Sequence, residues 1–372
     1  MTQSSIFNSQ SSIASRRVLL AMSGGIDSTA AALMLLEQGY ELVGCTFTTR
    51  YTSPASVEAA RSVAARLGIE HHIIDYSQRF EDTIIRYFIG EYQAGRTPNP
   101  CVLCNREIKF GALVEEADRL GCALIATGHY ARLTAKRSYS DSGLSAEGGP
   151  TAQRSFKSVA CAKDLSKDQS YFLWQIDPGI LDRVLFPLGD YTKLQVREYL
   201  ASKGFELLSK QGESQDICFI KDDYRAFLRE RLGEDYKDYM SFTIGQRKGL
   251  GVALGYPAFV MGINPLVLGH HDDLYTDTVT LRDVIFRGDP SAPVMAKIRY
   301  RSPAVAAILQ RSDPTAQRSY SEAILQRSDP TAQRSASDSG RLSFTQPIWA
   351  ATPGQSCVFY QNDLVVGGGI IC

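Results

Sequence analysis

The sequence has no excess of either charge, since 40 Lys and Arg residues balance 40 Asp and Glu residues. A nucleic-acid partner would therefore have to be held by local basic patches, so RNA binding is neither favoured nor excluded. No apolar run approaches the length of a membrane span, and residues 1–15 are a Ser- and Gln-rich tail without the apolar core of a secretory signal. We therefore predict a cytoplasmic protein with a disordered tail over 1–15 and no membrane partner.

The sequence also lacks the pattern of a disulfide framework, because its eight cysteines are scattered over 372 residues. In a reducing compartment such thiols are buried, catalytic or metal-binding. Cys45, Cys122 and Cys161 lie in apolar runs and are typical of core residues. Cys101 and Cys104, by contrast, are only three positions apart.

From Val18 to about Phe205, strand-like and helix-like patterns alternate. This alternation predicts a parallel sheet covered by helices. The expected strands are 18–22, 41–47, 71–76 and 123–127, and the expected helices are 28–38, 54–67, 80–93 and 105–120. Such a sheet binds its ligands at the carboxyl ends of its strands.

The stretch Met22-Ser-Gly-Gly-Ile-Asp-Ser28 lies between the first expected strand and helix. Unpaired N–H groups and the positive end of the helix dipole favour an anion at a helix start, and Gly24 and Gly25 let the backbone approach it. The spacing matches neither the Walker pattern nor the dinucleotide GxGxxG pattern. We predict a phosphate site here, joined at the sheet edge by Thr46-Phe47 and Gly128-His129.

From Phe242 onward the chain reads as short alternating strands, beginning with Phe242–Gly251. We predict a catalytic domain over 16–215, a small linking β domain over 216–286 and a C-terminal β-barrel over 287–372. Ala307–Ser319 is repeated unchanged as Ala323–Ser335, and Pro150–Ser155 carries the same ending. Two copies bury no core, so we expect dispensable, mobile inserts at 135–157 and 310–339.

Thr97-Pro-Asn-Pro-Cys-Val-Leu-Cys-Asn105 is the second informative stretch. We expect an extended loop that ends at a helix cap on Asn105, which would place Cys104 at a helix start with its thiolate favoured by the dipole. CxxC alone is compatible with half a zinc site, a redox pair or chance, and no second CxxC or HxxxH is present. Cys218 lies in an apolar run and by itself would read as core.

Together these segments resemble the tRNA-specific 2-thiouridylases of the ATP pyrophosphatase superfamily, from about Arg17 to the C-terminus. The blocks that carry the resemblance are Ser23–Ser28, Asn99–Asn105 with Glu107–Phe110, Thr127–Arg132, Lys167–Leu173, Gln215–Phe219, Thr243–Gly251, Arg299–Arg301 and Pro353–Ser356. The resemblance implies a parallel-sheet ATP pyrophosphatase domain followed by the linking β domain and the barrel.

The resemblance also implies a reaction. ATP would adenylate the C2 carbonyl oxygen of the wobble uridine in a tRNA anticodon loop, with Mg²⁺ offsetting the phosphate charge, and sulfur would then displace AMP. A donor protein would load Cys218 as a persulfide. Cys104 would liberate that sulfur or close a disulfide with Cys218. The residues implied for ATP are Ala21, Met22, Ser23, Gly24, Gly25, Ile26, Asp27, Ser28, Phe47 and Gly128.

Contacts to the tRNA are likewise implied residue by residue. Asn99, Pro100 and Cys101 would touch the target base, which leaves its stack to react. The residues implied for the rest of the tRNA, mostly through its phosphates, are His129, Lys167, Asp168, Gln169, Arg299, Tyr300 and Gln355.

One position departs from the family pattern, because Cys101 stands where the family's NPDxxCN motif has Asp. This replaces a carboxylate that could shuttle a proton or orient the base. Cys101, Cys104 and Cys218 could instead supply three thiolates to an iron–sulfur cluster that delivers sulfide.

Two other functions stay open on the residues alone. Another adenylating synthetase could use the same loop with a nitrogen nucleophile, although it would have no use for paired thiols. A non-catalytic RNA-binding protein with a degenerate nucleotide site would be expected to have lost Asp27 or a loop glycine, and both glycines and the acid are present.

Overall fold

The computed structural model describes residues 16–136, 156–212, 217–220, 223–252, 254–311 and 339–372. It divides into two compact units. The first comprises Met1–Ile85, Pro100–Lys221 and Asp363–Val365, and the second comprises Arg86–Asn99, Asp222–Asn362 and Val366–Cys372. The predicted inserts at 135–157 and 310–339 lie almost entirely outside the described residues.

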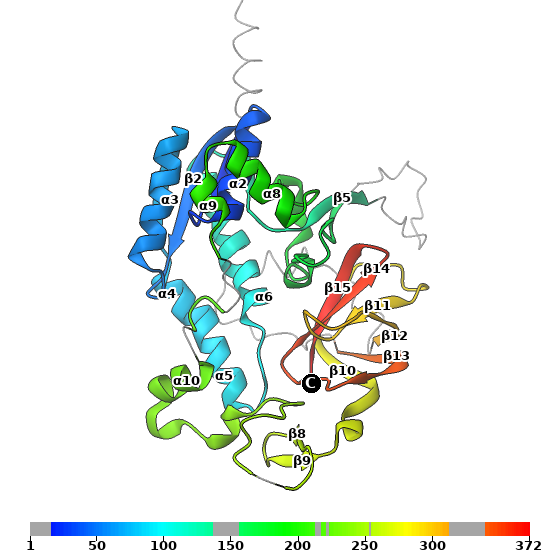
Figure 1. Cartoon of the computed structure of the whole chain (residues 1–372). Coiled ribbons are helices and arrows are strands. Elements are labelled where there is room, and N and C mark those ends of the chain that lie inside the picture. The colour runs from blue at the N-terminus through cyan, green and yellow to red at the C-terminus, as the bar shows by residue number, and fades with distance from the viewer. Residues whose placement is uncertain (1–15, 137–155, 213–216, 221–222, 253, 312–338) are drawn as a thin grey trace, which may run out of the picture. The chain divides into compact units, whose positions relative to one another are not determined.

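A five-stranded parallel sheet forms the centre of the first unit (Figure 1). Val18, Leu19 and Leu20 are fully buried, as expected for a central strand covered on both faces. The strand order is β3 (Glu70–Asp75), β2 (Glu41–Thr48), β1 (Arg17–Ala21), β4 (Leu124–Ala126) and β7 (Val184–Leu185). The predicted parallel sheet and four of its strands are thus confirmed.

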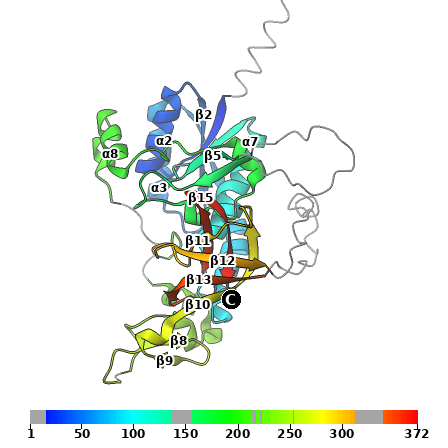
Figure 2. The ribbon, with the colours of Figure 1, turned by 90° about the vertical axis from the view of Figure 1, so that its right-hand side faces the viewer.

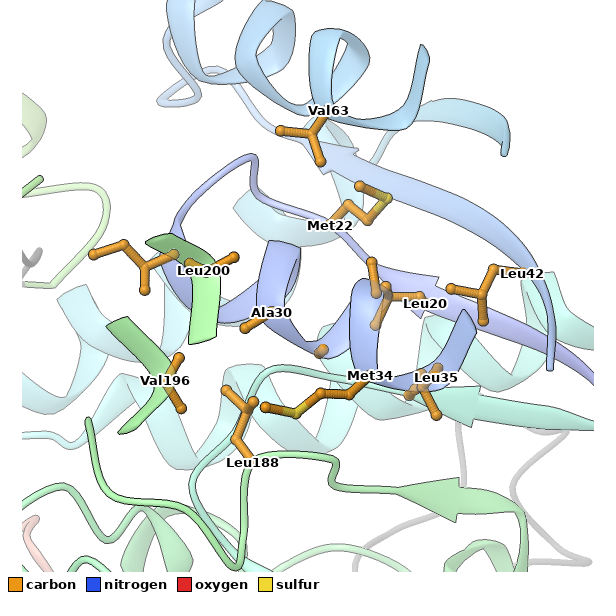
Figure 3. Close-up of a cluster of buried hydrophobic side chains, with 14 of the residues drawn as sticks. Leu20, Met22, Ala30, Met34, Leu35, Leu42, Val63, Leu188, Val196 and Leu200 are labelled. Carbon is orange, nitrogen blue, oxygen red and sulfur yellow. The ribbon is translucent and has the colours of Figure 1, made fainter. Parts of the chain in front are cut away.

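Helices α2 (Ile26–Glu37), α3 (Pro54–Leu67) and α8 (Lys193–Ser202) pack around this sheet. The bounds of α3 agree with the prediction, because Ser53 caps it and Pro54 occupies its first turn. Figure 3 shows Val196 and Leu200 of α8 beside Ala30 of α2, in one buried apolar cluster. This packing fixes α8 against the helix that follows the glycine loop.

The other two predicted helices are longer or less regular than expected. The first consists of α4 (Ser77–Phe80), the π-helical η1 (Glu81–Ile85) and α5 (Arg86–Gln93). The second begins at Pro100 rather than Asn105, and consists of α6 (Pro100–Cys104), the π-helical η2 (Asn105–Ala112) and α7 (Leu113–Arg119). The predicted cap at Asn105 was wrong because Pro100, with its fixed φ and missing N–H, fits a first helical turn.

The first unit also contains shorter elements. They are β5 (Arg132–Lys136), β6 (Phe156–Ala160), the 3₁₀ turns η3 (Ser170–Phe172) and η4 (Pro178–Arg183), and α9 (Glu206–Ser209). Strands β5 and β6 pair as an antiparallel hairpin.

A β-barrel of six antiparallel strands dominates the second unit, as predicted. The order is β10 (Tyr275–Phe286), β13 (Gly340–Trp349), β12 (Val305–Arg311), β11 (Val294–Lys297), β14 (Ser356–Gln361) and β15 (Leu364–Ile371). Pairing of β10 with β15 closes the barrel, which removes free sheet edges. Figure 2 shows β11, β12 and β13 side by side. The three-domain division stays a prediction, and β10 begins before residue 287.

The remainder of the second unit is mixed rather than all-β. It contains α10 (Tyr224–Leu232), the hairpin of β8 (Phe259–Gly262) and β9 (Val267–Gly269), and the 3₁₀ turns η5 (Gly233–Asp235), η6 (Asp238–Ser241) and η7 (His271–Leu274). The strand predicted over Phe242–Gly251 was wrong. Gly245, Gly249 and Gly251 adopt positive φ there, which forms turns instead of a ladder. In the part of the chain that the structure describes, no helix has the length and apolarity needed to cross a membrane.

Candidate functional site

The glycine loop joins β1 to α2, as the sequence predicted. Gly24 has φ +72°, and a Cβ there would lie 2.4 Å from the backbone nitrogen of Ala60, so a larger residue cannot fit without moving the chain. Gly25 is the N-cap of α2, and no side chain caps the helix. The first N–H groups of α2 are therefore available to an anion.

Hydroxyl groups hold this loop in shape. The Ser23 and Ser28 Oγ atoms lie 3.2 Å apart, and the Ser28 and Thr29 hydroxyls donate to the Gly25 carbonyl at 3.2 and 2.9 Å. Ser28 is buried. The loop is thus held in shape before any ligand arrives, which would reduce the ordering cost of binding an anion there.

Two further segments meet the loop, as predicted from the parallel sheet. The Thr46 hydroxyl donates to the Met22 carbonyl at 2.8 Å. A Cβ on Gly128 would lie 3.0 Å from the backbone of Asp27 and Ser28, so glycine allows the two segments to touch. Phe47 follows Thr46 on β2 and packs edge-on against Tyr76, with ring centroids 4.8 Å apart.

Sequence reasoning missed Lys193, which forms an ion pair with the acid of the loop. Its Nζ lies 2.7 and 2.9 Å from the two carboxylate oxygens of Asp27, and the Tyr130 hydroxyl donates to the same carboxylate at 2.9 Å. The Lys193 side chain is 10% exposed. The sequence signal next to Lys193 is the capping box of Thr192 and Gln195. It predicts the start of α8, but it does not indicate which residue Lys193 pairs with.

Cys104 is the last residue of α6, with four helical residues before it, so the predicted thiolate at a helix start was wrong. The N-terminal half-charge of a helix acts within its first turn, and here the helix begins at Pro100. Burial raises the pKa of the Cys104 thiol to about 12. Burial likewise raises the pKa of Cys101. Both groups are thiols at neutral pH.

Cys218 lies on a short turn closed by a hydrogen bond from the Ile220 N–H to the Ile217 carbonyl. The residue is exposed, whereas the next residue, Phe219, is buried between the rings of Tyr51 and Phe80, each centroid 5.8 Å away. This aromatic anchor holds the cysteine at the surface of the unit.

Desolvation by the surrounding protein raises the pKa of Cys218, although solvent reaches part of the residue. The three thiols share one neighbourhood. Charge on Cys218 raises the pKa of both Cys101 and Cys104, and Lys109 lowers the pKa of all three thiols by less than burial raises it. The three predicted cysteines therefore lie in the same part of the first unit, near enough to influence one another electrostatically.

These thiols do not form a ready metal site. None of the eight cysteines forms a disulfide, and no group of three or more His, Cys, Asp or Glu side chains among the described residues is arranged to hold a metal ion. Iron–sulfur clusters are held by cysteine thiolates. Binding one here would require Cys101, Cys104 and Cys218 to be placed so that all three sulfur atoms reach the same cluster. The residues as placed do not fit the iron–sulfur alternative.

His129, a predicted tRNA contact, is buried in the first unit. Its Nδ1 lies 2.8 Å from the Thr127 hydroxyl, and its ring packs between those of Phe110 and Phe186. Burial, with a smaller contribution from Lys109, lowers the pKa of the imidazole well below its ordinary value, so the ring is neutral. Direct contact with RNA would require this side chain to become exposed.

Two of the next three predicted tRNA contacts, Asp168 and Gln169, form hydrogen bonds within the first unit. Asp168 is buried and accepts hydrogen bonds from the Ala162 and Ser170 N–H groups and from the Ser170 hydroxyl. The Gln169 Oε1 accepts from the Tyr130 N–H at 2.9 Å, which helps to aim the Tyr130 hydroxyl at Asp27. Lys167 is partly exposed beside them.

The remaining predicted contacts lie in the second unit. The Arg299 guanidinium donates to the carbonyls of Ile244 and Ala350 and to the Thr352 hydroxyl. Tyr300 follows it and carries the Lys297 ammonium over its ring at 5.9 Å.

Gln355 holds the loop that precedes the cysteine stretch. Its Nε2 donates to the carbonyls of Thr97 and Pro98 at 2.9 and 3.2 Å, and the Thr97 N–H donates to the Pro353 carbonyl. Asn99, a predicted base contact, is the next residue in this loop. Gln355 therefore influences the base-contact segment through the backbone.

Residues 16–222 match the family model described as the tRNA methyl transferase HUP domain, and residues 326–371 match the aminomethyltransferase beta-barrel domain. A glycine loop at the start of a helix, on a parallel sheet followed by a barrel, is thus the architecture of a known class of tRNA-modifying proteins.

Relatives with known names identify one family within this class of tRNA-modifying proteins. The chain is 42% identical over 385 residues to "tRNA-specific 2-thiouridylase MnmA 3" from Bacteroides fragilis, with 96% of this chain and 94% of the relative covered. It is 38% identical to "tRNA-specific 2-thiouridylase MnmA" from Amoebophilus asiaticus, covering 95% of each, and 38% identical to the protein of that name from Carboxydothermus hydrogenoformans, covering 96% and 98%. The chain belongs to the tRNA-specific 2-thiouridylase family, which confirms the resemblance and the predicted enzyme class, a tRNA-uridine 2-sulfurtransferase.

Proposed function

We propose that this enzyme adenylates the C2 carbonyl oxygen of the wobble uridine in a tRNA anticodon loop and replaces that oxygen with sulfur from a cysteine persulfide. The products are 2-thiouridine, AMP and pyrophosphate. The observations that carry the proposal are the glycine loop at the start of α2 and two cysteines without a disulfide, Cys104 and Cys218, in the same unit. An adenylating synthetase with a nitrogen nucleophile would have no use for these thiols.

ATP is the phosphate ligand that the loop fits best. Its phosphates would meet the N–H groups at the start of α2, where Gly24 and Gly25 leave room for close approach. The uracil oxygen attacks the α phosphorus, the N3 proton is lost, and pyrophosphate leaves with the electron pair of the broken bond. Mg²⁺ would offset the phosphate charge of the nucleotide.

The thiols would then complete the exchange in two steps. The terminal sulfur of a Cys218 persulfide attacks C2, AMP leaves, and the base sulfur stays bonded to Cys218 Sγ. The Cys104 thiolate attacks that Sγ, which forms a Cys104–Cys218 disulfide and leaves the electron pair on the base sulfur. N3 regains a proton, and an external thiol reductant reopens the disulfide. The exposure of Cys218 supports loading by a persulfide-carrying donor protein.

Cys101 gives this chain a third thiol where the family resemblance implies an acid. Its raised pKa supports a neutral group beside the target base, without the charge of a carboxylate. We propose that Asn99 and Pro100 then orient the base and that Cys101 takes no proton in the reaction. The same proposal assigns Lys167, Arg299 and Tyr300 to the tRNA.

The test measures pyrophosphate release and 2-thiouridine by mass analysis, using a tRNA with uridine at the wobble position and a persulfide donor. Both products are expected with wild-type enzyme, and pyrophosphate is expected to depend on the tRNA. If neither product forms with a competent donor, the proposed function fails.

A further inference from the structure

Lys193 is a buried cation beside the loop that is proposed to bind ATP. Its Nζ contacts both Asp27 oxygens, at 2.7 and 2.9 Å, and lies 5.5 Å from the centre of the Tyr130 ring. By contrast, the Lys203–Glu37 pair in the same unit has side chains 39% and 49% exposed. An exposed pair contributes little to stability, whereas a buried lysine strongly depends on its partner.

The position of Lys193 is set by the fold rather than by Asp27 alone. It is the first residue of α8, its N–H donates to the Asp164 carboxylate at 3.0 Å, and Thr192 forms a capping box with Gln195. One turn further along, Val196 packs in the cluster that also contains Ala30 of α2 (Figure 3). The packing of α8 against α2 therefore places the Lys193 ammonium at the start of α2.

Asp27 places a negative charge where an anionic ligand would bind, and Lys193 offsets that charge. A carboxylate in the first turn of α2 competes with an anionic ligand for the same N–H groups and the same end of the dipole. Two negative groups a few ångströms apart repel each other strongly in a partly buried site. Pairing with Lys193 and Tyr130 neutralises the carboxylate and holds it to one side.

We propose that Lys193 is a positioning residue of the anion site, which neutralises Asp27 so that the loop can accept a polyphosphate. This rests on the proposed function, because ATP is the polyphosphate named there. Lys193 acts through Asp27, so its effect on ATP binding depends on the charge of that residue.

The test is a set of equilibrium binding measurements with ATP on the full chain, in EDTA and in Mg²⁺, with uncharged adenosine as the reference ligand. The variants are Lys193→Met, Lys193→Arg, Asp27→Asn and the double variant, with Lys203→Met as the matched surface control. Thermal unfolding of each protein gives the folded fraction used to normalise binding.

In EDTA, Lys193→Met is expected to weaken ATP binding by about tenfold or more, because the Asp27 carboxylate then faces the phosphates without its cationic partner. Adenosine binding, Lys193→Arg and Lys203→Met are expected to stay within about threefold of wild type. Adding Asp27→Asn to Lys193→Met is expected to restore ATP binding, and Asp27→Asn alone and the double variant are expected to bind ATP with affinities within about threefold of each other, because Lys193 acts through the Asp27 charge.

A double variant that binds ATP no better than Lys193→Met would overturn the inference, as would unchanged binding in Lys193→Met. If Lys193→Met does not fold, the comparison of Asp27→Asn with the double variant decides, and a double variant that binds ATP at least about tenfold more weakly than Asp27→Asn overturns it, because Lys193 would then act without the Asp27 charge. Wild-type protein that binds no ATP in either buffer contradicts the proposed function itself.

Discussion

The glycine loop and the three cysteines lie in the same unit but differ in how far the structure has prepared them for chemistry. The loop is complete: hydroxyls fix its shape, Gly128 and Thr46 abut it, and Lys193 neutralises its acid. The three cysteines form no disulfide, and burial raises the pKa of each thiol, so all three are protonated at neutral pH. Under the proposed function, this difference predicts that nucleotide binding needs no rearrangement of the loop, whereas sulfur transfer depends on activation of the thiols by the donor and the substrate.

The largest effect that would sharpen this comparison is loss of one thiol. Cys218→Ser and Cys104→Ser are each expected to lower 2-thiouridine formation by about 10³-fold or more, because a hydroxyl cannot carry or release sulfane sulfur. Pyrophosphate release with tRNA is expected to survive in both variants. Cys372→Ser, which changes another exposed cysteine, is the control and should leave both products unchanged. Thiolation that persists in Cys218→Ser would contradict the persulfide route.

The next largest expected effect is a difference in pH dependence between sulfur transfer, which uses the thiols, and pyrophosphate release, which uses the loop. Burial raises the pKa of Cys104 to about 12, so at neutral pH nearly all of it is thiol and the thiolate fraction grows about tenfold per pH unit. Single-turnover sulfur transfer from preloaded enzyme is therefore expected to rise with that slope between about pH 7 and 9. Pyrophosphate release is expected to change far less over the same range. A flat transfer rate would show that Cys104 ionisation does not limit it.

The two loop glycines offer a matched pair of substitutions. Gly24→Ala places a Cβ 2.4 Å from the Ala60 backbone at a positive φ, and is expected to cost about 1–3 kcal/mol in unfolding free energy and to weaken ATP binding. Gly25→Ala, whose Cβ would meet only the Ser23 hydroxyl at 3.4 Å, is expected to change each much less. Denaturant unfolding and ATP titration measure both. Equal effects in the two variants would mean that the loop is not sterically fixed.

The smallest expected effect concerns the second unit. Gln355→Ala removes two hydrogen bonds that hold the loop before Asn99, each contributing about 0.5–1.5 kcal/mol. It is expected to raise the KM for tRNA severalfold without changing ATP binding. Gln361→Ala also removes two hydrogen bonds to carbonyls, those of Asp289 and Ala292, and is the control that should leave the KM for tRNA unchanged. An unchanged KM for tRNA in Gln355→Ala would show that Gln355 does not contribute to tRNA binding.

Local signals predicted the nucleotide half of the first unit well. A continuous apolar strand, two glycines and a helical pattern act over neighbouring residues, so β1, the loop and α2 could be placed with errors of one or two residues. In the second unit, β12 was missed because it ends inside the predicted insert, and its partner β13 lies beyond that insert. Its pairing is long-range and leaves little local trace.

The thiols and Lys193 show why the rest of the site could not be predicted. The pKa of Cys104 depends on the packing of the helix around it, and CxxC spacing carries no information about burial. Lys193 meets Asp27 across 166 positions of sequence, so only the packing of α8 against α2 reveals the pair. Asp168 and Gln169 read as polar contacts for tRNA, although Asp168 is buried and the Gln169 side chain accepts a hydrogen bond from the Tyr130 N–H.

The central claim is that one enzyme couples cleavage of ATP to replacement of a uridine oxygen by sulfur. The most direct test counts pyrophosphate and 2-thiouridine in the same quenched reaction of wild-type enzyme, tRNA, ATP and persulfide donor. The account predicts one pyrophosphate for each 2-thiouridine, with neither formed when tRNA is omitted. Formation of 2-thiouridine without matching pyrophosphate would contradict it.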